Sequence, residues 1–286
     1  MTTQSNTISF PRTGNDLLQP VLALHCSGAD GRQWRPLAEN LEPPLHLLTP
    51  AFYGAAGNAG WSGDHAFSLA DEAGPILELI DATAVPFHMI GHSYGGGVAL
   101  HIALQRPHAV SSLTLYEPSA FHLLRMAEPE EAGSFAEISA VAEATVRGLA
   151  NGDYRSAAGH FVDYWGGDGA WAALRPSLQT ALTQWLPKAP LDFRALIEEP
   201  TCLEAYRRLD FPVLILRGAF APAPTAAVAR LLAGALPNCE VKTIAGAGHM
   251  GPISHAETVN RHILNFLNAN QKSGAVFRRA LCRPTQ

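Results

Sequence analysis

The chain has 286 residues, of which 47% are hydrophobic and 16% are charged, and its formal net charge at pH 7 is −5. These values are typical of a globular protein with room for a sizeable core, and they exclude a disordered or fibrous class. They also argue against nucleic-acid binding, because positive charge is concentrated only in the last residues.

The start of the chain and the cysteines indicate the compartment. Residues Met1–Phe10 are polar and lack the basic start and apolar run of a secretory signal, although a mature chain whose signal had been removed would begin in the same way. No apolar stretch approaches the roughly 18 residues of a membrane span. The four cysteines have neither zinc-ligand spacing nor the density of a disulfide scaffold; they are Cys26, Cys202, Cys239 and Cys282. We therefore expect a soluble cytoplasmic protein with reduced thiols and no membrane span.

Short apolar runs alternate with amphipathic segments in the first part of the chain. In order, we predict a strand at Val21–Leu24, a helix at Trp34–Leu41, a strand at Leu45–Thr49, a glycine-rich loop at Pro50–Asp64, a helix from Leu69 to about Ala82 that Ser68 caps, a strand at Phe87–Ile90, a helix at Gly95–Gln105 and a strand at Leu113–Tyr116. This alternation is typical of a parallel sheet with helices on both faces.

The alternation then stops for about ninety residues, between Ser119 and about Arg208. Here the pattern predicts helices and no convincing strand; the helices are Phe135–Leu149, Tyr154–Tyr164 and Trp171–Trp185. The sheet resumes with a strand at Val213–Leu216, a helix at Thr225–Ala235, a strand from about Glu240 to Ile244 and a helix from about Ala256 to Leu267. We therefore predict a discontinuous α/β core, residues 1–118 and 209–270, with a helical insertion at 119–208. Residues 271–286 are basic and are expected to form a flexible tail.

The motif Gly91-His92-Ser93-Tyr94-Gly95-Gly96 lies between a predicted strand and a predicted helix, and it has the Gly-x-Ser-x-Gly pattern of a nucleophile elbow. Ser93 would lie at a tight, strained bend. The positions two before and two after it must then be nearly free of side-chain atoms, and Gly91 and Gly95 meet that demand. A glycine-rich chain can show this pattern by accident, but the strand before it and the helix after it favour the elbow.

With two further motifs, the elbow resembles the α/β-hydrolase fold, and specifically its single-chain members with a helical cap inserted after the sixth strand. The further motifs are His25-Cys26-Ser27-Gly28 after an early strand and Gly246-Ala247-Gly248-His249-Met250-Gly251-Pro252 before the last helix. The resemblance covers nearly the whole chain and implies a mostly parallel sheet of eight or nearly eight strands. A shared fold does not fix the substrate.

The resemblance makes Ser93 the nucleophile and His249 the base. A serine hydroxyl needs a base within hydrogen-bond reach to take its proton, and an imidazole titrates near neutrality. An oxyanion hole requires two backbone N–H groups. One would come from Tyr94, directly after the nucleophile, and the other from Cys26, where the family commonly carries glycine. Cys26 could act as a second nucleophile only if the pKa of its thiol were lowered.

The position where the family usually carries its acid is vacant. The segment after the seventh strand, Arg217 to Pro224, holds no carboxylate, and the nearest acidic residues, Asp210 and Glu240, would lie at the wrong edge of the sheet. We therefore assign the acid to Glu117, directly after the sixth strand, which resembles the position of the acid in haloalkane dehalogenases. The alternative is that Glu117 only braces the entrance to the insertion.

The insertion is rich in aromatic and large apolar residues, which favours a small or medium hydrophobic ester as the substrate. These residues are Phe121, Leu123, Leu124, Met126, Phe161, Tyr164, Trp165, Trp171, Trp185 and Phe193. Thioester and lactone hydrolysis, carbon–carbon bond cleavage and acyl transfer use the same machinery. The loop from His25 to Gly31 is faintly similar to that of the carbon–carbon hydrolases, which makes them the second candidate.

A rival from a different class is a hydrolase fold that only binds a small ligand, because the usual acid position is vacant. We expect no metal site and no cofactor, since Gly95-Gly96-Gly97 belongs to the elbow helix and not to a dinucleotide-binding loop. The expected partner is a small hydrophobic substrate, and the sequence indicates no oligomeric state.

Overall fold

The computed structural model describes residues 19–83, 85–125 and 131–271. Met1–Phe10, the basic tail from residue 272 onward, Met126 and Cys282 lie outside these ranges. Six parallel strands form the sheet of the described residues, in the order β2-β1-β3-β4-β5-β6. They are β1 (Gln19–Leu24), β2 (Leu45–Leu48), β3 (Phe87–His92), β4 (Val110–Tyr116), β5 (Val213–Gly218) and β6 (Cys239–Ile244). Each strand predicted from the sequence is present. The strand β4 is the one that the resemblance numbers as the sixth, because about eight strands were expected and the described residues form six.

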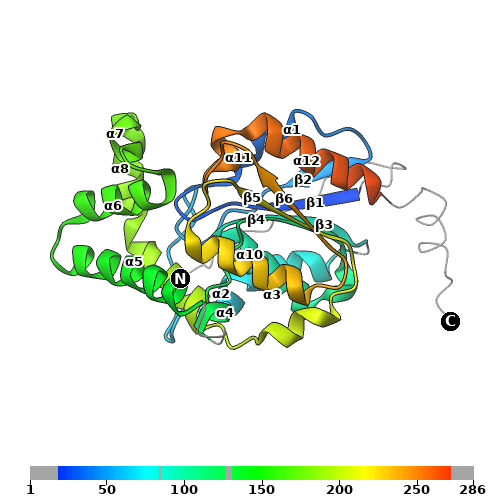
Figure 1. Ribbon diagram of the computed structural model, residues 1–286, viewed down its shortest axis with the longest axis horizontal. Coiled ribbons are helices and arrows are strands. Elements are labelled where there is room, and N and C mark those ends of the chain that lie inside the picture. The colour runs from blue at the N-terminus through cyan, green and yellow to red at the C-terminus, as the bar shows by residue number, and fades with distance from the viewer. Residues whose placement is uncertain (1–18, 84, 126–130, 272–286) are drawn as a thin grey trace, which may run out of the picture.

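Helices cover both faces of the sheet (Figure 1). One face packs against α2 (Leu69–Asp81), α3 (Tyr94–Gln105) and α10 (Ala223–Ala235), and the other packs against α1 (Arg35–Ala38) and α12 (Ala256–Ala269). Successive strand residues alternate between the two cores: Leu22 and Leu24 belong to the first and Val21 and Ala23 to the second. A strand buried on both faces needs this unbroken apolar sequence. None of the helices described here combines the length and the apolar character needed to cross a membrane.

The segment between β4 and β5 is helical, as predicted, and Figure 1 shows its helices α5 to α8 grouped at one side of the sheet. Its helices are α4 (His122–Arg125), α5 (Ala132–Ala150), α6 (Tyr154–Gly166), α7 (Ala170–Ala173), α8 (Pro176–Trp185) and α9 (Ala189–Glu198), with short 3₁₀ turns at Leu186–Lys188 and Leu203–Arg208.

One helix prediction in this segment is wrong. The sequence suggested one continuous helix at Trp171–Trp185, but the chain leaves the helical conformation at Leu174 and Arg175, whose ψ angles are 140° and 145°. Pro176 is the cause, because a proline disfavours the helical region for the residue before it and is well suited to the first position of a new helix.

All neighbouring strands of the sheet are parallel, so their carboxyl ends lie at the same edge. Cys26 follows β1, Ser93 follows β3 and Glu117 follows β4. His249 lies in the loop between β6 and the short helix α11 (Gly251–Ser254). The topology therefore brings residues that are distant in the sequence to one edge of the sheet, where open α/β sheets bind their ligands.

Candidate active site

Ser93 lies at a sharp turn between strand β3 and helix α3. Its φ and ψ are 55° and −119°, a backbone conformation that residues with a side chain rarely adopt. The turn is possible because its neighbours are glycines: a Cβ atom on Gly91 would lie 2.5 Å from the Gly95 carbonyl oxygen, and one on Gly95 would lie 2.5 Å from the carbonyl oxygen of Leu24. The sequence motif therefore folds as the elbow that it predicts.

Three of the residues singled out in the sequence form one hydrogen-bonded row. Ser93 Oγ lies 2.8 Å from His249 Nε2, and His249 Nδ1 lies 2.8 Å from Glu117 Oε2. All three are buried, with exposed fractions of 6% for Ser93, 3% for His249 and 0% for Glu117. Because the carboxylate accepts the Nδ1 proton, Nε2 is left to accept the proton of the serine hydroxyl.

Glu117 is held by three donors. Its Oε1 accepts from the backbone N–H of Gly218 at 2.8 Å, and its Oε2 accepts from the Thr225 hydroxyl at 2.9 Å as well as from His249. Its backbone has a φ of 42°, which turns the side chain from the end of β4 toward the end of β5. The carboxylate thus lies at the end of β5, where the family usually carries its acid and this chain has none.

The two backbone groups predicted to form an oxyanion hole differ in their surroundings. Tyr94 N–H is in the first turn of α3, where helical N–H groups have no partner within the helix. The Cys26 N–H donates to Gln33 Oε1 at 3.1 Å. An oxyanion could use the Cys26 N–H only by replacing the Gln33 oxygen as its acceptor.

Gln33 belongs to a buried hydrogen-bond network that extends to the loop carrying His249. Its Nε2 donates to His92 Nδ1 at 3.0 Å, and His92 Nε2 donates to the carbonyl oxygen of His249 at 2.9 Å. Burial, with a smaller effect from His249, holds the pKa of His92 well below its usual value, so the ring is neutral and carries its proton on Nε2. His92 therefore links Gln33 to the loop that carries His249. No sequence pattern points to Gln33, because its partner His92 is distant in the chain.

The thiol of Cys26 is not poised to react. Burial raises its pKa to about 12, so it is protonated at neutral pH. The neighbouring His25 is used structurally: its Nδ1 donates to the Cys26 carbonyl at 2.8 Å, and its Nε2 accepts from the Phe52 N–H at 3.3 Å. These contacts of His25 fix the loop after β1. Because the Cys26 thiol is protonated, Ser93 is the better nucleophile candidate at this edge of the sheet.

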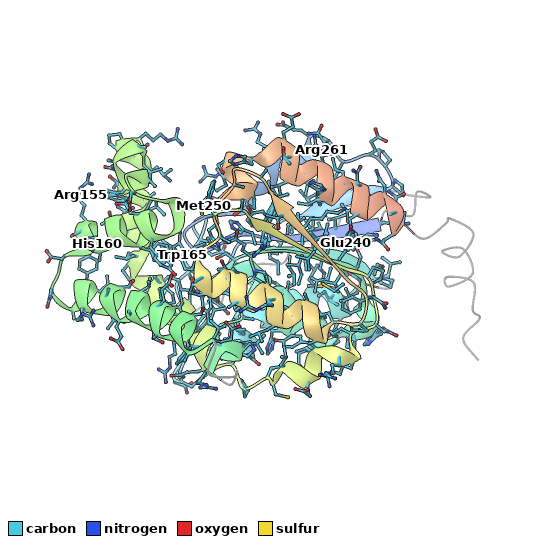
Figure 2. All side chains as sticks on the ribbon, viewed as in Figure 1. Arg155, His160, Trp165, Glu240, Met250 and Arg261 are labelled. Carbon is cyan, nitrogen blue, oxygen red and sulfur yellow. The ribbon has the colours of Figure 1, made fainter. Side chains whose placement is uncertain are left out.

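A cavity of about 440 Å³ adjoins Ser93 and His249. Of the large apolar residues noted in the insertion, Phe121, Phe161, Trp165 and Phe193 line the cavity, whereas Leu123, Leu124, Tyr164, Trp171 and Trp185 do not. Figure 2 shows Trp165 and Met250 where the insertion faces the loop region of α11, and both line the cavity. The ring centroid of Trp165 lies 4.3 Å from that of His249, so the insertion covers the imidazole directly.

A buried group of charges joins the insertion to the sheet domain beside this cavity. Lys188 Nζ donates to Glu72 Oε2 at 2.8 Å and to Asp192 Oδ1. Burial lowers the pKa of Lys188, but its two carboxylate partners offset that effect and the net shift is upward. Burial raises the pKa of Asp192 to about 6. Glu72 also accepts from the hydroxyl of Tyr94 at 2.8 Å, so the cluster contacts the residue next to the nucleophile.

The sequence model of the alpha/beta hydrolase family matches residues 21–262, which is most of the chain. The chain belongs to the alpha/beta hydrolase family. Among related alpha/beta hydrolases, lipase LipV of Mycobacterium tuberculosis is 32% identical over 100 residues, which cover 35% of this chain and 37% of that protein. The first curated relatives are matched over only about a third of their length, 30–37%.

A second relative matches along almost its whole length. BpoC of Mycobacterium tuberculosis, which carries the name of a non-heme bromoperoxidase, is 25% identical over 269 residues, or 91% of this chain and 97% of that protein. Its crystal structure has a TM-score of 0.65 and covers 90% of this hydrolase and 95% of BpoC at 22% identity. The hydrolase MGS-M2, from a deep-sea metagenome library, has a TM-score of 0.76, covering 91% of this chain and 92% of its own at 14% identity. The family and its relatives support a hydrolase activity, and at such identities the solved structures show the fold alone.

Proposed function

We propose that this alpha/beta hydrolase cleaves a small or medium hydrophobic ester through an acyl-enzyme intermediate. The observation that carries the proposal is the hydrogen-bonded row Ser93–His249–Glu117 opening on an apolar cavity. Side chains in that order perform acyl transfer in unrelated folds, because a base next to the hydroxyl and an acid next to the base are what the chemistry requires.

The chemical steps follow from the contacts. His249 Nε2 takes the proton of Ser93 as Oγ attacks the ester carbon, and it then gives the proton to the departing alkoxide. Glu117 keeps the other imidazole nitrogen protonated and stabilises the imidazolium that forms. Water then attacks the acyl carbon with the help of His249, and Ser93 is released.

The developing oxyanion is assigned to the N–H groups of Tyr94 and Cys26. For the Cys26 N–H this requires the substrate oxygen to take the place of Gln33 Oε1, which accepts from it in the free protein. A carbonyl oxygen that gains negative charge is a stronger acceptor than a neutral amide oxygen, so the exchange is favoured as the transition state forms.

The cavity supports a hydrophobic substrate of limited size. Its volume of about 440 Å³ lies at the lower end of the range for small-molecule sites, and aromatic side chains of the insertion line it. We propose that residues 119–208 act as a cap that binds the apolar part of the substrate and shields His249 through Trp165. We further propose that residues 1–118 and 209–270 form the α/β core. We also propose that the protein is cytoplasmic.

A labelling experiment separates an enzyme from a protein that only binds a ligand. A fluorophosphonate probe should label the wild-type chain on Ser93 and should fail to label Ser93→Ala. No labelling of the wild type would refute the serine hydrolase and favour ligand binding alone. A panel of p-nitrophenyl esters of increasing acyl length then tests the substrate class. Faster turnover of a vinylogous diketone acid than of any ester would favour a carbon–carbon hydrolase.

A further inference from the structure

Ser93 Oγ has a second hydroxyl beside it. Ser119 Oγ lies 3.2 Å away, while His249 Nε2 lies at 2.8 Å on the same oxygen. The proton of Ser93 is directed to His249, because Glu117 fixes the imidazole proton on Nδ1. The hydrogen bond between the serines must then use the proton of Ser119, so Ser119 donates and Ser93 Oγ accepts.

The position of Ser119 is fixed by the backbone. Its N–H donates to the carbonyl oxygen of Ser93 at 3.0 Å, so the two serines are joined by backbone as well as side chain. Ser119 is buried, with an exposed fraction of 2%, yet it lines the cavity. It lies two residues after Glu117, and the turn after β4 therefore delivers both the carboxylate to His249 and the hydroxyl to Ser93.

The strand order places Ser119 on the opposite side of the elbow from Cys26, one of the two assigned oxyanion donors. The elbow follows β3, which lies between β1 and β4. Cys26 follows β1 on one side, and Ser119 follows β4 on the other, together with Glu117. The contact that the Ser119 hydroxyl makes is with the nucleophilic oxygen itself, at 3.2 Å.

We propose that Ser119 is a catalytic residue that stabilises Ser93 Oγ when this oxygen leaves the acyl group. This inference rests on the proposed serine hydrolase function. In deacylation a water molecule gives a proton to His249 Nε2 and its oxygen bonds to the acyl carbon. The bond between that carbon and Ser93 Oγ then breaks, the electron pair stays on Oγ, and His249 returns the proton to it. The Ser119 hydroxyl donates to Oγ throughout this step.

Deacylation depends on the hydrogen bond from the Ser119 hydroxyl to Ser93 Oγ more than acylation does. In the acyl-enzyme, Oγ is an ester oxygen and a weak acceptor, and it becomes strongly accepting as negative charge develops on it. The hydrogen bond is therefore much stronger in the transition state than in the state before it, which is the condition for catalysis. In acylation Oγ begins as a hydroxyl that already accepts from Ser119, so the gain is smaller.

The test is pre-steady-state hydrolysis of a p-nitrophenyl ester by the wild type, Ser119→Ala and Ser119→Thr. We expect Ser119→Ala to lower the deacylation rate by about 10- to 100-fold, to lower the acylation rate less, and so to increase the burst of p-nitrophenol. Ser119→Thr, which keeps the hydroxyl, should restore much of the deacylation rate. The matched control is Ser112→Ala, because Ser112 is a buried serine of β4 whose hydroxyl contacts His88 at 2.8 Å instead of the site.

Equal losses in both steps, or an unchanged rate of deacylation in Ser119→Ala, would overturn the inference. If Ser119→Ala does not fold, Ser119→Cys gives the same comparison, since a thiol is similar in size but a weak donor. The two proposals fail in different ways. A wild-type chain that a fluorophosphonate does not label refutes the serine hydrolase. If the wild type is labelled and active, and the ratio of the acylation rate to the deacylation rate in Ser119→Ala equals that of the wild type, only the role of Ser119 is refuted.

Discussion

Replacing Glu117 with glutamine perturbs the row of hydrogen bonds at its buried end. The carboxylate accepts from Gly218 N–H at 2.8 Å, from the Thr225 hydroxyl at 2.9 Å and from His249 Nδ1 at 2.8 Å. A glutamine of the same shape has one acceptor oxygen and an amide group that only donates. The N–H of Gly218 is fixed in the backbone, so the amide oxygen must face it. The opposite orientation would bring two buried donors together without acceptors.

With the oxygen facing Gly218, the amide of the variant points its N–H at His249 Nδ1. That nitrogen must then accept, and the ring proton moves to Nε2, where it faces the Ser93 hydroxyl. An imidazole in this tautomer cannot take the serine proton. The loss of the correct tautomer in a triad lowers kcat by about ten-thousand-fold, which corresponds to about 5 kcal/mol of transition-state stabilisation.

The assay is steady-state hydrolysis of a p-nitrophenyl ester by the wild type, Glu117→Gln and Glu199→Gln. Glu199 is a matched control, because it also contacts a histidine, His101 at 3.2 Å, but is not among the residues that line the cavity. We expect the large loss only in Glu117→Gln, with slow residual labelling of Ser93 by a fluorophosphonate and normal kinetics in Glu199→Gln. A kcat for Glu117→Gln within about tenfold of the wild type, or about 1.4 kcal/mol, would refute the tautomer argument. It would favour the alternative that Glu117 only braces the entrance to the insertion.

Three further predictions concern the surroundings of the site. Lys188→Met should lower the free energy of unfolding by about 3–5 kcal/mol, because it leaves buried carboxylates without their cation; a urea titration that shows no loss would contradict this. Burial raises the pKa of Asp192 from 3.8 to about 6, so its contribution to stability is complete below pH 3.8 and is lost as the pH rises through 6. Asp192→Asn should remove that pH-dependent part of the unfolding free energy, and parallel wild-type and variant profiles would argue against it. Because the pKa of the Cys26 thiol is about 12, iodoacetamide at neutral pH should modify the exposed Cys202 and leave the peptide with Cys26 unmodified, as mass spectrometry can test.

The sequence by itself determined the order of strands and helices and most of the candidate site. Short unbroken apolar runs such as Val21–Leu24 favour buried strands, and a strand, a Gly-x-Ser-x-Gly turn and a helix define an elbow locally. Glu117 was proposed as the acid because the position usual in the family is empty and because haloalkane dehalogenases, which this arrangement resembles, carry their acid after the sixth strand. The break of the predicted helix at Pro176 was also readable from local rules, because proline restricts the residue before it.

Only the tertiary structure decided how the polar side chains around the site pair. Gln33 contacts Cys26 and His92, Ser119 contacts Ser93, and Lys188 contacts Glu72 across a sequence separation of 116 residues. Gln33, Ser119, Lys188 and Glu72 belong to no motif, because a hydrogen bond between distant segments requires only that the fold bring them together. The backbone pattern fixes which edge of the sheet carries the site, whereas the packing of loops and of the insertion at that edge fixes which donor meets which acceptor.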